Sequence, residues 1–166
     1  MDVTIREATE QDYERLCVIM DEVDRMHGAA LPQRFTAPDG PSRKRAYISD
    51  LIREANKGLF VAETEGHLVG FVHVMVRDTP DVPILIARRY AVIDNLGVKQ
   101  GLRRRGIGQA LMVRAEAWAL AHGASSMELT VYAFNQTAER FYREIGYEIL
   151  SHRMTKPLLT GQTETE

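Results

Sequence analysis

Residues 98–111 read VKQGLRRRGIGQAL, and this stretch decides the fold because it leads from a strand into a helix through a basic, glycine-containing turn. The first turn of a helix carries unpaired N–H groups and a partial positive charge. Gly106 and Gly108 have no side chains to block that backbone, and Arg103 to Arg105 add positive charge. The stretch therefore predicts an anion site at the start of a helix.

The identity of the anion does not follow from this turn alone. The turn lacks the Gly-x-x-x-x-Gly-Lys-Ser/Thr pattern of a P-loop. A dinucleotide fingerprint would place Gly or Ala where Leu111 stands, and it would follow the first strand of the chain. A solvated basic turn before a helix remains the competing interpretation at this point.

The elements on either side follow from hydrophobic periodicity and turn residues. In chain order we expect a strand ending near residue 8, helices over about 9–27 and 42–56, strands over 59–63, 67–77 and 90–98, a helix over 106–122, a strand over 126–131, a helix over 135–145 and a last strand over 147–154. Gly28 is expected to end the first helix, and Glu65-Gly66 to form a hairpin turn. The order β-α-α-β-β-β-α-β-α-β predicts one mixed α/β domain over 1–159, followed by a polar tail over 160–166 that its composition predicts to be disordered.

Two motifs resemble those of the GNAT N-acetyltransferase superfamily, and they follow one another in the order found there. The acetyl-CoA motif of that superfamily is Arg or Gln, two residues, Gly, one residue, then Gly or Ala, and here it is filled by Arg103, Gly106 and Gly108. Downstream, residues 135–147 read NQTAERFYREIGY and resemble its Asn-x-x-Ala-x-x-Phe-Tyr-x-x-x-Gly-Phe segment, with Tyr147 in place of the last Phe. Residues 93–98, IDNLGV, look like its central strand.

The resemblance implies a single mixed-sheet GNAT-like α/β domain whose central strand splays from its neighbour at a bulge, with acetyl-CoA as co-substrate. Free backbone groups of that strand would pair with the pantetheine arm, and the N–H groups at the helix start would hold the pyrophosphate. The residues that it implies in binding acetyl-CoA are Leu96, Gly97, Val98, Arg103, Arg104, Arg105, Gly106, Ile107, Gly108, Gln109, Asn135, Ala138 and Phe141.

The reaction implied by the resemblance is direct attack of a primary amine on a thioester, without a covalent enzyme intermediate. An ammonium must lose a proton before it attacks, and the leaving thiolate benefits from a proton donor. Tyr142 occupies the superfamily's position for that acid, while Asp94 on the central strand is the candidate base and Glu128 on the next strand is an alternative. A backbone N–H near Leu96 would stabilise the oxyanion. The competing interpretations are a core aromatic for Tyr142 and solvated or ion-paired acids for the two carboxylates.

The acceptor amine is not identified by the sequence. In the superfamily, the first helices and the loop after them, here residues 28–41, shape that choice, so we expect His27 and Phe35 to line the acceptor cleft. The competing interpretation of His27 is a packed helix residue. Polyamine, amino acid, aminoglycoside, peptide N-terminus and protein lysine all stay open, as do a longer acyl donor and an O-linked acceptor. A non-catalytic acyl-CoA-binding sensor is the alternative from a different functional class.

Composition limits the number of domains, the partners and the localisation that we expect. The 166 residues, of which 45% are hydrophobic, are typical of one globular domain with a core. A net charge of −2 gives no electrostatic case for nucleic acid or an anionic membrane as partner. Cys17 is the only cysteine and is best explained as a small core residue, and no Cys/His cluster has zinc spacing, so no metal is expected. Without a recognisable signal peptide or membrane span, we expect a cytoplasmic protein, and the resemblance allows a homodimer.

Overall fold

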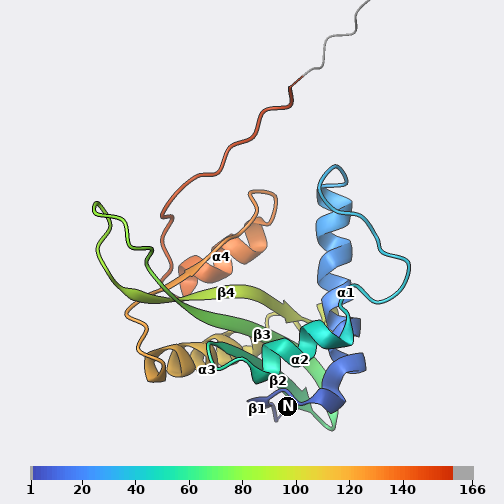
Figure 1. Ribbon diagram of the computed structural model, residues 1–166. Coiled ribbons are helices and arrows are strands. Elements are labelled where there is room, and N and C mark those ends of the chain that lie inside the picture. The colour runs from blue at the N-terminus through green and yellow to red at the C-terminus, as the bar shows by residue number, and fades with distance from the viewer. Residues whose placement is uncertain (1, 159–166) are drawn as a thin grey trace, which may run out of the picture. The chain divides into compact units, whose positions relative to one another are not determined.

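The computed structural model describes residues 2–158, so the predicted polar tail over 160–166 lies outside the described residues. Residues up to Phe134 form one compact unit and residues from Asn135 form another. The first unit contains β1 (Thr4–Glu7), η1 (Glu10–Asp12), α1 (Tyr13–Ala30), α2 (Arg45–Arg53), β2 (Lys57–Thr64), β3 (His67–Asp78), β4 (Arg89–Val98), η2 (Gln100–Leu102), α3 (Ile107–Ala121) and β5 (Met127–Leu129) (Figure 1). The second unit contains α4 (Gln136–Glu144).

The strands form one mixed sheet in the order β1-β2-β3-β4-β5. Neighbours are antiparallel except for β4 and β5, which run parallel because α3 returns the chain to the same end of the sheet. The turn between β2 and β3 is formed by Glu65 and Gly66, both with positive φ, at 49° and 77°. This confirms the hairpin expected from the Glu-Gly pair.

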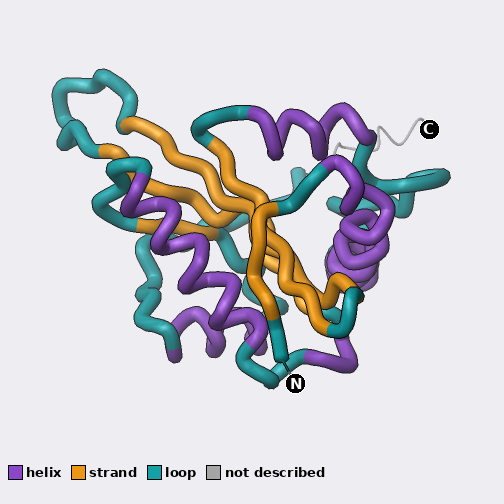
Figure 2. The backbone as a smooth tube through the Cα atoms, turned by 90° about the horizontal axis from the view of Figure 1, so that it is seen from below, coloured by secondary structure: helices purple, strands orange, loops and turns teal. Residues whose placement is uncertain are grey.

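Helices cover both faces of the sheet (Figure 2). On one face, α1 and α2 enclose a core with the sheet, and its fully buried members include Leu16, Ile19, Met20, Ile48, Leu51 and Phe71. On the other face lies α3, since a Cβ added to Gly70 would meet Leu111 and Ile107, and Gly70 and Phe71 are adjacent on β3 and so face opposite ways. Cys17 is buried on α1, as expected for a small core residue.

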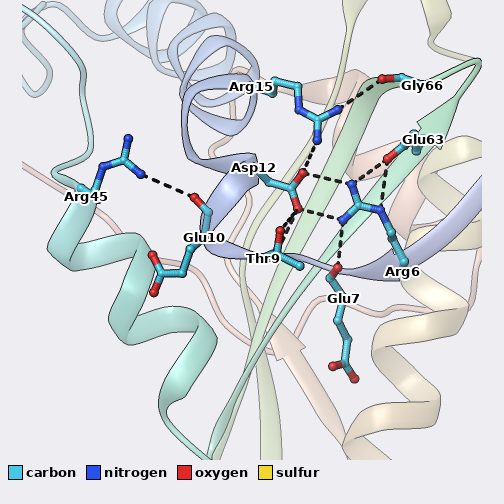
Figure 3. Close-up of polar contacts among 9 residues, drawn as sticks. All are labelled: Arg6, Glu7, Thr9, Glu10, Asp12, Arg15, Arg45, Glu63 and Gly66. Atoms are coloured by element: carbon cyan, nitrogen blue, oxygen red, sulfur yellow. Dashed lines mark hydrogen bonds and ion pairs between the residues drawn. The ribbon is translucent and has the colours of Figure 1, made fainter.

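A charged network fastens the start of α1 to the sheet (Figure 3). Asp12 has a side chain with no exposed area, and its two carboxylate oxygens accept hydrogen bonds from Arg6 at 2.7 and 3.0 Å. Arg15 donates to the same carboxylate at 2.6 Å, and Arg6 also pairs with Glu63 on β2. The Thr9 N–H donates to Asp12 as well, so the buried charge is fully partnered and sets where the first helix begins.

Two expected features are wrong. The first helix does not stop at Gly28 but continues to Ala30, because glycine can adopt helical angles at a cost of about 1 kcal/mol and ends a helix only where the chain also turns away. The last strand, over 147–154, is not formed, and those residues are irregular. A strand needs a neighbouring strand for its hydrogen bonds, and the described part of the second unit contains none. The other expected elements are present, with shifted ends.

Candidate active site

The turn between β4 and α3 has the geometry of an anion site. Arg104 and Gly106 both adopt positive φ, at 60° and 79°. Gly106 is the N-cap of α3, and no side chain caps the helix, so the first N–H groups have no side-chain acceptor. A Cβ placed on Gly106 would meet nothing within 4 Å, so the space in front of the helix start is open.

The three arginines of this turn divide into two kinds. The Nε of Arg103 donates to the carbonyl of Val98 at 3.0 Å, and its guanidinium lies 3.5 Å from the Glu22 carboxylate on α1. Arg103 therefore fixes the turn against the end of β4. Arg104 and Arg105 are exposed and make no ion pair with any described residue, so their positive charges are available to an anion at the start of α3.

The central strand splays as the resemblance implied. β5 pairs with β4 only at Ala91, Val92 and Ile93, whereas β3 pairs with β4 as far as Val98. Among the residues that the structure describes, no strand therefore pairs with the stretch 94–98, the unpaired half of β4, on its β5 side. Leu96 and Val98 in this half are partly buried. Its backbone groups on that side are the ones an extended ligand chain can pair with.

Asp94 lies at the bulge that starts the unpaired half of β4. Ile93 pairs with Val74 and Asn95 pairs with His73, so Asp94 is the extra residue between them. The Nδ1 of His73 lies 3.2 Å from the Asp94 carboxylate. His73 is 2% exposed whereas the Asp94 side chain is 45% exposed, so the carboxylate reaches solvent with the imidazole behind it.

The hydrogen bond from His73 holds the pKa of Asp94 below its ordinary value, and positive charge from Arg77 and Arg43 acts in the same direction. On α2, Tyr47 lies within the influence of this carboxylate, since burial and then the charge of Asp94 raise the Tyr47 pKa. Asp94 is therefore ionised at neutral pH and faces the α2 side of the sheet. The sequence reasoning missed His73, although a histidine between Val72 and Val74 in an apolar strand was a usable signal.

Glu128, the alternative base, is held in an ion pair with Arg88 at 2.5 Å. Arg88 also donates to Ser126, the residue just before β5. Both contacts lie near the start of β5, so Glu128 matches the interpretation of an ion-paired acid.

His27 and Phe35 come together with two aromatic residues that the sequence reasoning missed. The His27 ring centroid lies 5.5 Å from that of Phe35 and 5.6 Å from those of both Tyr132 and Phe134. We call these four residues the aromatic cluster. The Nδ1 of His27 lies 2.9 Å from the Val23 carbonyl, which can only accept, so Nδ1 carries the proton and Nε2 is left as an acceptor. The Tyr-x-Phe pair directly after the strand expected over 126–131 was the missed signal.

The second unit holds the remaining expected residues. Asn135 is the N-cap of α4, and its side-chain oxygen accepts from the Ala138 N–H at 3.1 Å. The Phe141 and Tyr142 rings pack at 5.2 Å, and Tyr147 stacks edge-on against Tyr142 at 5.8 Å. Burial raises the pKa of Tyr142 to about 12, so its hydroxyl keeps its proton throughout the neutral range.

The model of the acetyltransferase (GNAT) family matches residues 20–147. The chain belongs to the GNAT family. Among curated GNAT relatives, an uncharacterized N-acetyltransferase of Methanocaldococcus jannaschii is 35% identical over 104 residues, which cover 63% of this chain and 45% of that protein. The chain thus spans less than half the length of that relative.

Solved structures agree on the GNAT fold. A mutant of the BH1408 protein from Bacillus halodurans superposes with a TM-score of 0.90 at 27% identity, covering 94% of this chain and 99% of that one. An aminoglycoside N-acetyltransferase, AAC(6')-Iy, crystallised with CoA, superposes with a TM-score of 0.72 at 14% identity, covering 94% of this chain and 99% of that one. Among residues 2–158, no helix combines the length and the hydropathy needed to cross a bilayer.

Proposed function

We propose that this protein transfers the acetyl group of acetyl-CoA to a primary amine by direct attack, without a covalent enzyme intermediate. The observation that carries the proposal is the start of α3, where an open helix terminus, a glycine with positive φ and the unpaired guanidinium groups of Arg104 and Arg105 come together. Membership of the GNAT family and the CoA complex of a protein with the same fold support the same donor.

The donor is held by backbone more than by side chains. The N–H groups from Arg104 to Gly108 bind the pyrophosphate, and the unpaired half of β4, with Leu96, Gly97 and Val98, pairs with the pantetheine arm. By family resemblance, Asn135 at the N-cap of α4 and Ala138 and Phe141 on α4 bind the same arm.

In the chemical step, the amine nitrogen bonds to the thioester carbon, and the C–S bond breaks as CoA leaves. Asp94 takes the proton of the acceptor, directly or through water, because its carboxylate is ionised and solvent-exposed. An N–H near Leu96 stabilises the oxyanion. Tyr142 returns a proton to the leaving thiolate, since its hydroxyl stays protonated at neutral pH.

The test is an acetyl-CoA turnover screen against primary amines, in which thiol release is followed. We expect Tyr142→Phe to lower kcat by about 10²-fold while the KM for acetyl-CoA changes little. Unchanged turnover in Tyr142→Phe would remove the acid assignment. Tight CoA binding without acetylation of any amine would replace the enzyme by the acyl-CoA sensor.

A further inference from the structure

The aromatic cluster lies beside the unpaired half of β4. A Cβ on Gly97 would come within 3.0 Å of Val23 on α1, and the Glu22 carboxylate accepts from the Gln100 N–H at 2.8 Å. This turn of α1 therefore packs on the end of β4, and His27 follows one helical turn later.

The other side of the cluster comes from the chain after β5. The last residue of β5, Leu129, pairs with Ile93, which is the last residue of β4 that pairs with β5. Tyr132 and Phe134 follow within five residues and contact His27 from that side. The cluster thus bridges α1 and the diverging chain after β5, next to the strand half that holds the thioester arm in the proposed function.

The rings of the cluster are packed on one another and are only partly covered. Phe35 and Tyr132 lie 5.7 Å apart, and Tyr132 stacks on Phe134 at 6.0 Å, distances that are favourable for aromatic pairs. Tyr132 and Phe134 nevertheless remain 36% and 37% exposed. These partly exposed rings offer a surface for another ring.

The acidic residues of α1 nearest the cluster already have partners. Asp21 accepts from the Ser42 hydroxyl, Glu22 from the Gln100 N–H, and Asp24 from the Arg43 guanidinium at 2.8 Å. Asp24 is paired with Arg43 and Glu22 lies 3.5 Å from Arg103, so Asp21 is the one of these three carboxylates without a cationic partner among the described residues. A polycationic acceptor is recognised by several such carboxylates. The charge balance therefore favours an acceptor with a single amine.

We infer that the acceptor is a small primary amine carrying an aromatic ring, which stacks on Tyr132 and Phe134 while its nitrogen points toward the unpaired half of β4. The inference rests on the proposed function and names the substrate class for that site. The free Nε2 of His27 accepts an N–H of such an amine at the edge of the ring surface.

The experiment compares phenethylamine, hexylamine and spermidine as acceptors in wild type, Tyr132→Ala and Tyr132→Phe. We expect wild type to prefer phenethylamine over both others by about three- to tenfold in kcat/KM. Tyr132→Ala should lose this preference, whereas Tyr132→Phe, which keeps the ring, should retain it. Unchanged thermal midpoints show that both variants are folded. A preference for spermidine, or an equal loss for all three amines in Tyr132→Ala, would overturn the inference.

A second readout separates this inference from the proposed function. If wild type releases no thiol with these three amines or with any other primary amine of the screen, the proposed function fails. Saturation-transfer NMR then measures phenethylamine binding directly. Ring-proton saturation in wild type that disappears in Tyr132→Ala supports the aromatic site on its own, and no saturation in wild type refutes it.

Discussion

The glycine at the start of α3 permits a test in which strain and ligand binding are separated. Gly106→Ala places a Cβ at a φ of 79°, in open space, so steric clash is absent and the cost is the left-handed backbone alone. That cost is about 1 kcal/mol, equivalent to a fall of roughly 2–4 °C in the thermal midpoint for a chain of this length. The same backbone change misaligns the N–H groups that hold the pyrophosphate.

Gly123→Ala is the matched control, because Gly123 follows the C-terminal end of the same helix with a φ of 82° and an added Cβ there makes an ordinary contact of 3.6 Å. Both variants should lose about the same stability in thermal denaturation. Only Gly106→Ala should raise the KM for acetyl-CoA, by about tenfold or more, since a hydrogen bond to a charged group contributes about 1.5–3 kcal/mol. Equal KM values in the two variants would refute the assignment of this turn to the pyrophosphate.

Three further predictions concern the sheet and its charges. Its arginine partners hold the pKa of Asp12 below the ordinary carboxyl range, so the ionised carboxylate stabilises the fold above about pH 4, and this stabilisation is lost as the pH falls further. In urea denaturation, the free energy of unfolding of Asp12→Asn should be lower than that of wild type by about 2–4 kcal/mol at pH 7. It should also change less with pH between about pH 4 and 2 than that of wild type. Gly97→Ala brings a Cβ to 2.6 Å from the Phe71 ring and should destabilise the fold by about 1–3 kcal/mol in the same assay. Because His73 lowers the Asp94 pKa, Asp94→Asn should reduce kcat by about 10²-fold uniformly from pH 6 to 9, and a wild-type acid limb that vanishes in this variant would contradict that reasoning.

The local signals in the sequence were sufficient for most of the fold. The helix start at Gly106 and the hairpin at Glu65 depend on residues whose backbone preferences act within a few positions, so they could be predicted. The strand expected over 147–154 could not be judged in this way, because alternation reports a side-chain pattern and not the presence of a partner strand.

The candidate site was only partly predictable for the same reason. The motifs at Arg103 and Asn135 are local and were found, and so were Asp94 and His27 as candidates. The contacts that surround them join residues far apart in the chain, such as His27 with Phe134 and Asp94 with His73. Neither pair has a spacing that a sequence pattern can reveal, since the sheet and α1 bring them together only after folding.

The bulge at Asp94 interrupts the alternation of side chains between the two faces of the sheet along β4. Paired residues of neighbouring strands point to the same side of a sheet, so Ile93 points to the side of Val74 and Gly97 to the side of Phe71. Val74 and Phe71 point to opposite sides of the sheet. Regular alternation would instead put Ile93 and Gly97 on the same side. Deleting Asp94 would restore regular alternation and leave these pairs in place, with Ile93 still opposite Val74 and Gly97 still opposite Phe71. The pairing of β4 with β3 therefore does not require the extra residue, and a chain without it would keep the sheet register but lose the half-exposed carboxylate beside His73.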